Sequence, residues 1–192
     1  MPAPTLARAD DVVVVIIDIQ ERLAAVMNQR DKVVARSIKL ARAAALLGAP
    51  IIATRQYPKG LGPVVPEVDE ALTELARQGA RVAEVDKTAF CCAAEPAFQS
   101  ALRATGRTQV VLCGMETHIC VAQTALALAA EGHQVHVVAD ACCSRETEAH
   151  DVALDRLRSA GVVVTLTESV MYEAVGEAGT DRFRSLLDIV KD

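Results

Sequence analysis

The stretch VVVVIID at residues 12–18 decides the fold class, because it is a short run of β-branched residues that ends in an acid. Such a run is typical of a strand buried on both faces of a parallel sheet. Similar apolar stretches recur at 50–54, 80–86, 108–114, 134–140 and 162–166. Helical patterns lie between them, at 31–47, 68–78, 95–105, 117–130 and 147–160. This alternation predicts βαβ units that form a six-stranded, mainly parallel sheet with helices on both faces.

The composition favours a single domain spanning residues 1–192. Hydrophobic residues make up 52% of the chain and aromatic residues only 3%, so the core is expected to be aliphatic. The 20 basic and 25 acidic residues give a net charge of −5, which argues against nucleic-acid or anionic-membrane partners. The chain shows neither a membrane-spanning apolar stretch nor a secretion signal, and we therefore expect a cytoplasmic protein.

The six cysteines include two adjacent pairs, Cys91-Cys92 and Cys142-Cys143. Disulfide frameworks belong mainly to small secreted chains, and neighbouring cysteines bridge each other only with strain. No C-x-x-C occurs, which argues against a thioredoxin-type motif and against a zinc ribbon. We therefore expect free thiols.

Three polar residues follow predicted strands: Asp18, Lys87 and Cys120. In open α/β sheets, ligands bind beyond the carboxyl ends of the strands, so these side chains could share one cleft. Cys120 is expected in the first turn of a helix, where the helix dipole would lower the pKa of its thiol. Each residue also has an ordinary interpretation, as a buried inert cysteine, a capping carboxylate or a solvated lysine.

His118 lies two residues before Cys120, so on a helix the two side chains would point to different sides. It is therefore expected in the pocket or behind it, and not as the base for the thiol. The sequence contains no G-x-G-x-x-G, Walker A, G-x-S-x-G or H-E-x-x-H motif.

At these residues the sequence resembles the isochorismatase-like cysteine hydrolases. The similar segments are VVVVIIDIQE (12–21), VDKTAF (85–90), GMETHICVAQTALAL (114–128) and VVADACCSR (137–145). Their combination in this order is specific, and the resemblance covers nearly the whole chain. The segments at 54–68 and 165–179 look like the subgroup called isochorismatase domain-containing proteins.

The resemblance implies a Rossmann-like, three-layer α/β/α sandwich and a catalytic triad of Asp18, Lys87 and Cys120. It also implies a cis peptide between Met115 and Glu116 that directs backbone N–H groups at an oxyanion. Loop position suggests that several further residues line the substrate pocket: Gln20, Gln56, Phe90, Thr117 and His118.

The predicted function is cleavage of a C–N bond in a small amide- or imide-like substrate through a thioester. No cofactor and no metal are expected, because the segment TRQYPKGLGP at 54–63 lacks the Asp and His residues with which nicotinamidases of this superfamily bind metal. A metal-dependent nicotinamidase-type amidase and a catalytically silent oligomeric interaction protein remain as alternatives. A homo-oligomer is expected in either case.

Overall fold

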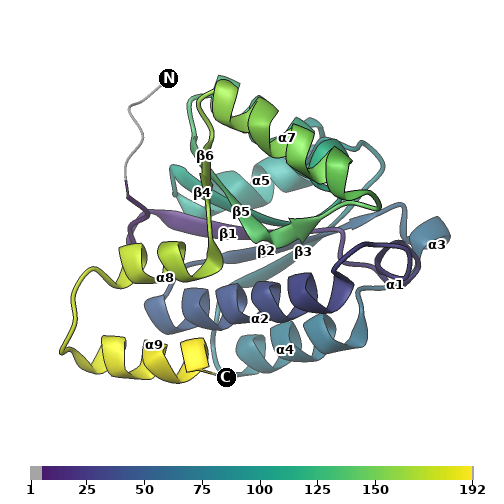
Figure 1. Ribbon diagram of the computed structural model, residues 1–192. Coiled ribbons are helices and arrows are strands. Elements are labelled where there is room, and N and C mark those ends of the chain that lie inside the picture. The colour runs from purple at the N-terminus through teal and green to yellow at the C-terminus, as the bar shows by residue number, and fades with distance from the viewer. Residues whose placement is uncertain (1–5, 192) are drawn as a thin grey trace.

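The computed structural model describes residues 6–191 and confirms the three-layer α/β/α sandwich (Figure 1). The six strands pair only in parallel, in the order β3-β2-β1-β4-β5-β6. The strands are β1 (Val12–Ile17), β2 (Ile51–Gln56), β3 (Val82–Lys87), β4 (Gln109–Met115), β5 (Gln134–Cys143) and β6 (Val163–Thr165).

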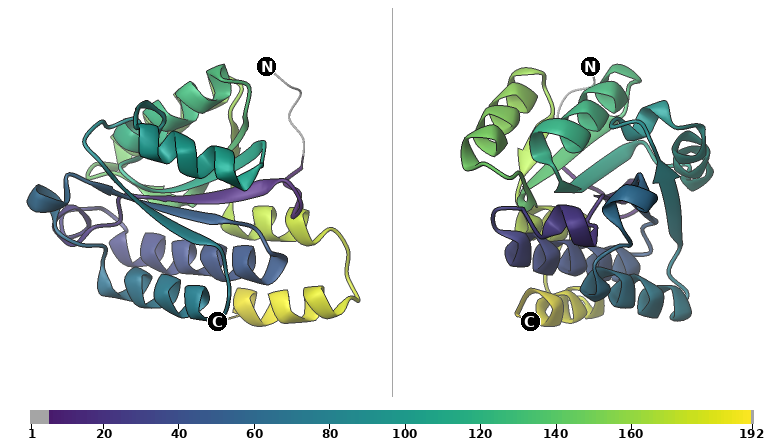
Figure 2. Two further views of the ribbon diagram at one scale, coloured as in Figure 1. Left: turned by 180° about the vertical axis from the view of Figure 1, so that it is seen from behind. Right: turned by 90° about the vertical axis from the view of Figure 1, so that its right-hand side faces the viewer.

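Helices cover both faces of this sheet, as the views in Figure 2 also show. One layer holds α2, α4, α8 and α9, and the other holds α5, α6 and α7. The helices are α1 (Glu21–Ala24), α2 (Arg30–Leu47), α3 (Pro58–Leu61), α4 (Pro66–Arg77), α5 (Pro96–Thr105), α6 (Ala122–Ala130), α7 (Thr147–Ser159), α8 (Thr167–Val175) and α9 (Asp181–Lys191), with short turns η1 (Cys92–Ala94) and η2 (Thr117–Val121).

The central strand β1 explains where a site can form. All six of its residues are buried, as its β-branched composition predicts. It pairs with β2 on one side and with β4 on the other, so the strand order reverses between β1 and β4. The carboxyl end of β1 therefore lies at the topological switch point, where open α/β sheets bind ligands.

Gly114 lets β4 approach β1 closely at this end of the sheet. Its φ is +121°, and a Cβ built on it would lie 2.1 Å from the carbonyl oxygen of Ile17. Only glycine fits such a position. The segment that follows Gly114 is thereby brought beside Asp18.

Several element boundaries differ from the sequence prediction. Strand β2 continues to Gln56 and β5 continues to Cys143, and the segment between β2 and α4 contains the short helix α3. The helix expected at 117–130 was wrong in its first part, because residues 117–121 form a π-helical turn before α6. In this turn the Val121 N–H donates to the Glu116 carbonyl, five residues back. A single π-helical turn changes the spacing of apolar residues too little for hydrophobic periodicity to distinguish it from an α-helix.

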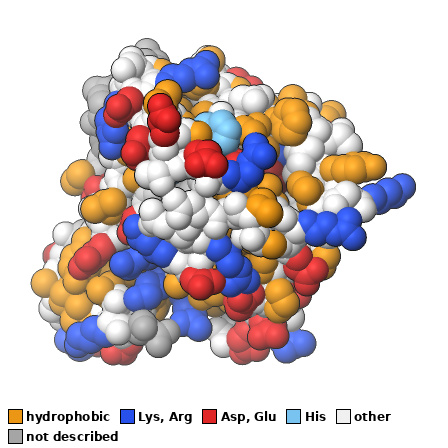
Figure 3. Space-filling view, turned by 45° about the vertical axis from the view of Figure 1, so that its right-hand side comes forward, with side chains coloured by type: hydrophobic (Ala, Val, Ile, Leu, Met, Phe, Trp, Pro, Cys, Tyr) orange, Lys and Arg blue, Asp and Glu red, His pale blue; other side chains and the backbone are white. Residues whose placement is uncertain are grey.

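The charge distribution on the surface and the length of the helices are relevant to the predicted absence of nucleic-acid and membrane partners. Acidic and basic side chains are intermixed on the face in Figure 3, without one continuous basic area. Within residues 6–191, every helix is too short or too polar to cross a membrane. The absence of nucleic-acid and membrane partners stays a prediction.

Candidate functional site

Asp18, Lys87 and Cys120 come together at the carboxyl edge of the sheet. The Lys87 Nζ lies 2.7 Å from Asp18 Oδ2 and donates to Cys120 Sγ at 3.7 Å. All three side chains are buried, with relative exposures of 0% for Asp18, 2% for Lys87 and 5% for Cys120. An acid, a cation and a thiol from three separate segments thus form one connected group.

Asp18 is fixed by its neighbours on β2. Its φ is +54°, a left-handed conformation that is uncommon for a residue with a side chain. Its backbone N–H donates to the Thr54 carbonyl, and the Thr54 hydroxyl donates to Asp18 Oδ1 at 2.7 Å. This conformation turns the carboxylate toward Lys87 at the point where β1 ends.

Lys87 is the last residue of β3 and is surrounded by acceptors. Its ammonium donates to Gln56 Oε1 at 2.6 Å and to the carbonyls of Ala89 and Phe90 at 3.3 Å. Burial alone would lower the pKa of Lys87, but the Asp18 carboxylate raises it above its usual value. Lys87 therefore stays charged although it is buried.

Cys120 lies in the π-helical turn η2 and not in the first turn of an α-helix. Burial raises the pKa of the Cys120 thiol, the negative charge of Asp18 raises it further, and Lys87 opposes both only in part. The lowered pKa expected from the sequence was therefore wrong. The resting thiol is protonated, so its proton has to be removed when the sulfur attacks.

The peptide bond between Met115 and Glu116 is cis in the structure. Met115 is fully buried at the end of β4, and the Glu116 side chain is also buried. The Glu116 carboxylate accepts hydrogen bonds from the backbone N–H of Arg145 at 3.0 Å and from its Nε at 3.1 Å. We call residues 116–121 the cysteine turn, and its first residue is therefore tied to the segment that follows β5.

Gln20 and Gln56 were expected to contact substrate, but the geometry favours positioning roles. Gln20 is fully buried, and its amide donates to the carbonyls of Gln56 and Gly62 and accepts the Gln56 N–H. The Gln56 amide bridges Lys87 and the Thr88 carbonyl. These contacts occupy both side chains inside the protein.

The other three predicted pocket residues lie in different surroundings. Phe90 is 55% exposed, and its carbonyl contacts Lys87. Thr117 is fully buried, with its hydroxyl 2.9 Å from His150 Nδ1 in a hydrogen bond. His118 is half-buried, with its Nδ1 2.8 Å from Ser144 Oγ. Phe90 is thus the most accessible of the three for a substrate contact.

The sequence prediction did not include Thr54, Ser144, Arg145 or His150. Thr54 could have been found from strand register, since it pairs with Ile17, the residue before Asp18. Ser144 and Arg145 end the similar segment VVADACCSR, which gave them no role, and His150 lies outside the similar segments. They approach the cysteine turn only because β5 runs beside β4 in the folded chain.

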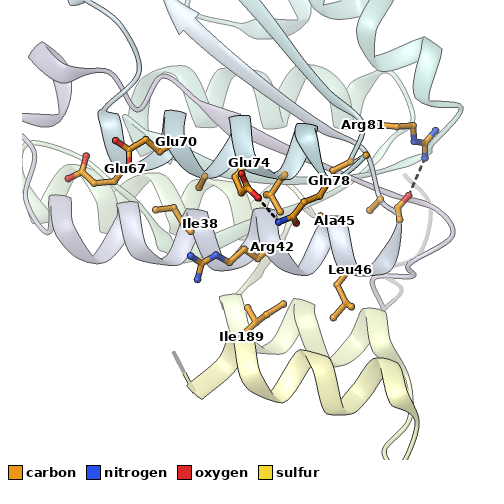
Figure 4. Close-up of a pocket in the computed structure, with 16 residues that line it drawn as sticks. Ile38, Arg42, Ala45, Leu46, Glu67, Glu70, Glu74, Gln78, Arg81 and Ile189 are labelled. Atoms are coloured by element: carbon orange, nitrogen blue, oxygen red, sulfur yellow. Dashed lines mark hydrogen bonds between the residues drawn. The ribbon is translucent and has the colours of Figure 1, made fainter.

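The cavity drawn in Figure 4 belongs to another part of the molecule. It has a volume of about 780 Å³ and lies between α2, α4 and α9, and it is lined by Glu67, Glu70 and Glu74 of α4 and by Arg42 of α2. None of the predicted site residues lines it.

Among residues 6–191, no group of three or more His, Cys, Asp or Glu side chains is arranged to hold a metal ion. All six cysteines are free.

The family model described as "Isochorismatase domain" matches residues 12–169, from β1 into α8. The chain belongs to the isochorismatase family. Isochorismatase domain-containing protein 2 of Bos taurus is 39% identical over 176 residues, which cover 91% of this chain and 80% of the relative. Isochorismatase domain-containing protein 1 of Salmo salar is 38% identical over 91% of this chain, which spans only 59% of that longer relative.

Solved structures show that the fold is that of isochorismatase-family hydrolases. The MAR1 ribonuclease of Caenorhabditis elegans superposes with a TM-score of 0.89 at 30% identity, covering 98% of this chain and 93% of its own. YcaC from Pseudomonas aeruginosa, solved with hexane-2,5-diol and covalent acrylamide, gives 0.84 at 26% identity, covering 96% and 91%. The YcaC gene product of Escherichia coli, described as an octameric hydrolase of unknown specificity, gives 0.85 at 24% identity, covering 98% and 92%.

Proposed function

We propose that this isochorismatase-family protein is a cysteine hydrolase that cleaves a C–N bond of a small amide- or imide-like substrate. The proposal rests on one observation, the buried chain of contacts from Asp18 through Lys87 to Cys120. Structural ion pairs also occur at such depths, but a thiol beside a buried lysine and carboxylate has the parts that nucleophilic catalysis requires.

The first half-reaction forms a thioester. The Cys120 sulfur attacks the substrate carbonyl carbon while Asp18 accepts the thiol proton, since the raised pKa of Cys120 keeps that proton on the sulfur at rest. The C–N bond then breaks as Asp18 returns the proton to the leaving nitrogen. Lys87 stays charged throughout and balances the negative charge of Asp18 before the thiol proton is taken and again after it is returned.

The second half-reaction restores the enzyme. Asp18 takes a proton from water, the resulting hydroxide attacks the thioester carbon, and the C–S bond breaks to give a carboxylic acid. The sulfur regains its proton from Asp18. In both halves the carbonyl oxygen becomes an oxyanion, for which we assign the backbone N–H groups of Glu116 and Cys120 as donors. One such donor contributes on the order of 10²–10³ in rate.

The relatives support a reactive nucleophile on this fold. The Pseudomonas aeruginosa protein is described with covalent acrylamide, an electrophile that thiols attack. The chain also lacks, in its described residues, the cluster that a metal-dependent nicotinamidase would need. We therefore favour thiol chemistry over the metal-dependent alternative.

The test is a screen of small amides, hydantoin-like imides and carbamoyl compounds, followed by mass spectrometry of trapped enzyme. We expect an acyl group on the peptide that contains Cys120, and we expect turnover to be lost in Cys120→Ala. Cys113→Ala is the matched control, because Cys113 is a fully buried thiol on β4 to which the mechanism gives no role. It should retain turnover.

The wild type and the Cys120→Ala variant also test two alternatives, a silent interaction protein and a ribonuclease. Turnover by Cys120→Ala at the wild-type rate would contradict the proposal, and turnover of no compound would favour a silent interaction protein. One relative is named a ribonuclease, so an RNA substrate belongs in the screen. Cleavage of RNA that persists in Cys120→Ala would contradict a cysteine hydrolase and the expectation that this acidic chain has no nucleic-acid partner.

We also propose that the chain forms a homo-oligomer, as sequence analysis predicted. The E. coli neighbour is described as octameric. Within one chain, α6 buries Ala122, Ala125 and Leu128 against its own fold, while Leu126 and Ala129 stay half-buried. Light scattering coupled to size-exclusion chromatography gives the copy number, and a monomer at micromolar concentration would contradict this proposal.

A further inference from the structure

Three consecutive residues just before Cys120 are tied to one segment elsewhere in the chain. Glu116 is bound by Arg145, Thr117 by His150 and His118 by Ser144. We call residues 144–150 the clamp. Its three side chains contact the cysteine turn at 3.1, 2.9 and 2.8 Å, and each contacts a different residue of that turn.

The sheet explains why the clamp reaches this turn. Strands β4 and β5 run in parallel to their ends, where Met115 pairs with Cys143, so the residues that follow leave the sheet side by side. The clamp is held from its other side by Asn28, whose backbone N–H donates to the Ser144 carbonyl at 3.2 Å and whose amide donates to Thr147 at 2.6 Å. The clamp is therefore fixed between the turn and the segment before α2.

The clamp acts on buried parts of the turn. Thr117 is 0% exposed and Glu116 is 5% exposed. Loss of the His150 ring removes the partner of the buried Thr117 hydroxyl, and loss of the Arg145 side chain leaves the Glu116 carboxylate with the Arg145 backbone N–H alone. The hydrogen bonds of these two side chains run to His150 and Arg145, whereas the Cys120 sulfur is bound by Lys87. The clamp thus holds the residues that frame the oxyanion donors, and a separate group of side chains holds the thiol.

We propose that the clamp residues Ser144, Arg145 and His150 are positioning residues that aim the backbone N–H groups of the cysteine turn at the oxyanion. This inference rests on the proposed function, because it assumes that Cys120 attacks a carbonyl. The clamp orients the donors, whereas Asp18 and Lys87 control the thiol.

Two probes separate these roles. With p-nitrophenyl acetate, the Cys120 sulfur forms an acetyl thioester, p-nitrophenolate leaves and Asp18 takes the thiol proton, so an oxyanion develops. With iodoacetamide, the sulfur displaces iodide from a saturated carbon while Asp18 takes the thiol proton, and no oxyanion forms. Acylation therefore depends on the oxyanion donors, while alkylation depends on the thiol, its base and its access but not on those donors.

The experiment compares Ser144→Ala, Arg145→Gln and His150→Ala with the wild type. The burst of p-nitrophenolate measures acylation, and mass spectrometry of the Cys120 peptide measures alkylation. We expect acylation to fall by about tenfold or more and alkylation to change by less than about twofold. His150→Asn should recover most of the acylation, because an asparagine amide reaches the position of the His Nδ1 and can bond to Thr117.

Arg184→Gln is the matched control. Arg184 is an exposed arginine on α9 that is paired with Asp181. Arg184→Gln therefore removes the same charge as Arg145→Gln but no contact with the cysteine turn. Thermal unfolding of every variant shows whether a loss reflects the fold, and the His150→Asn comparison stays informative if one alanine variant is unstable.

The outcomes distinguish this inference from the function on which it rests. Clamp variants that acylate at the wild-type rate, or that lose acylation and alkylation in parallel, would overturn the positioning role alone. A burst that is unchanged in Cys120→Ala, or absent from the wild type, would overturn the thioester mechanism and the clamp with it.

Discussion

Lys87 and His136 are both basic side chains buried in the same sheet, yet burial has opposite outcomes for them. Lys87, at the end of β3, contacts Asp18 and three uncharged acceptors, and its pKa is raised. His136, the third residue of β5, is 0% exposed, and neither of its ring nitrogens has a hydrogen-bond partner among residues 6–191. Burial lowers the pKa of His136, and the Glu173 carboxylate does not offset this.

The difference shows that burial by itself does not set a protonation state. The pKa of a buried base rises when a carboxylate in direct contact outweighs the effect of burial, and it falls when the nearby charge does not. In this protein the paired base lies at the carboxyl edge of the sheet, beside the thiol, and the unpaired one lies within the core. Only the first can take part in chemistry that needs charge.

The largest expected effect follows from Asp18→Asn, which removes the carboxylate that distinguishes Lys87 from His136. Acylation of Cys120 by p-nitrophenyl acetate should fall by about 10²–10⁴-fold, because the base for the thiol proton is lost. Asp86→Asn is the control, since Asp86 is an exposed carboxylate on β3 paired with Arg55. Acylation by Asp18→Asn at the wild-type rate would show that another group takes the proton.

Lys87→Met removes the cation of the buried ion pair between Asp18 and Lys87. It leaves Asp18 buried without a counter-charge and should lower the free energy of unfolding by about 3–5 kcal/mol, measured in urea. The double variant Asp18→Asn/Lys87→Met should recover part of this loss. Arg55→Met, which breaks partly exposed ion pairs with Glu84 and Asp86, should cost no more than about 1 kcal/mol. If Lys87→Met and Arg55→Met lowered the free energy of unfolding equally, the buried ion pair would have no special role in stability.

The smallest expected effect concerns His136 and pH. Because its pKa is lowered in the folded state, the unfolded chain takes up the proton first as the pH falls through about 6.5. The free energy of unfolding should therefore decrease toward acid. His136→Leu should remove this part of the decrease while keeping stability at pH 8.

His150 also contributes to the pH dependence of the unfolding free energy. Burial also lowers the pKa of His150, so some acid sensitivity should persist in His136→Leu. An unfolding free energy that falls equally steeply with and without His136 would show that this residue is not a source of the pH dependence.

Much of the fold could be predicted from local sequence. The β-branched run at 12–18, the helix that ends before Gly48 and the alternation along the chain specify strands and helices through short-range preferences. The positions of Asp18, Lys87 and Cys120 after strands predicted their meeting, because parallel strands end at one edge. The family resemblance led to the prediction of a cysteine hydrolase, which stays a prediction.

The sequence by itself determined most of the helices and strands, because these depend on residues close together along the chain. It also placed Asp18, Lys87 and Cys120 after strands of one parallel sheet, and such strands end at one edge. Only the tertiary structure decided that Cys120 lies in a π-helical turn, that its thiol is protonated at rest and that Ser144, Arg145 and His150 hold the turn. A pKa is the balance between burial and charges brought from distant segments. That balance exists only after β1, β3, β4 and β5 have assembled.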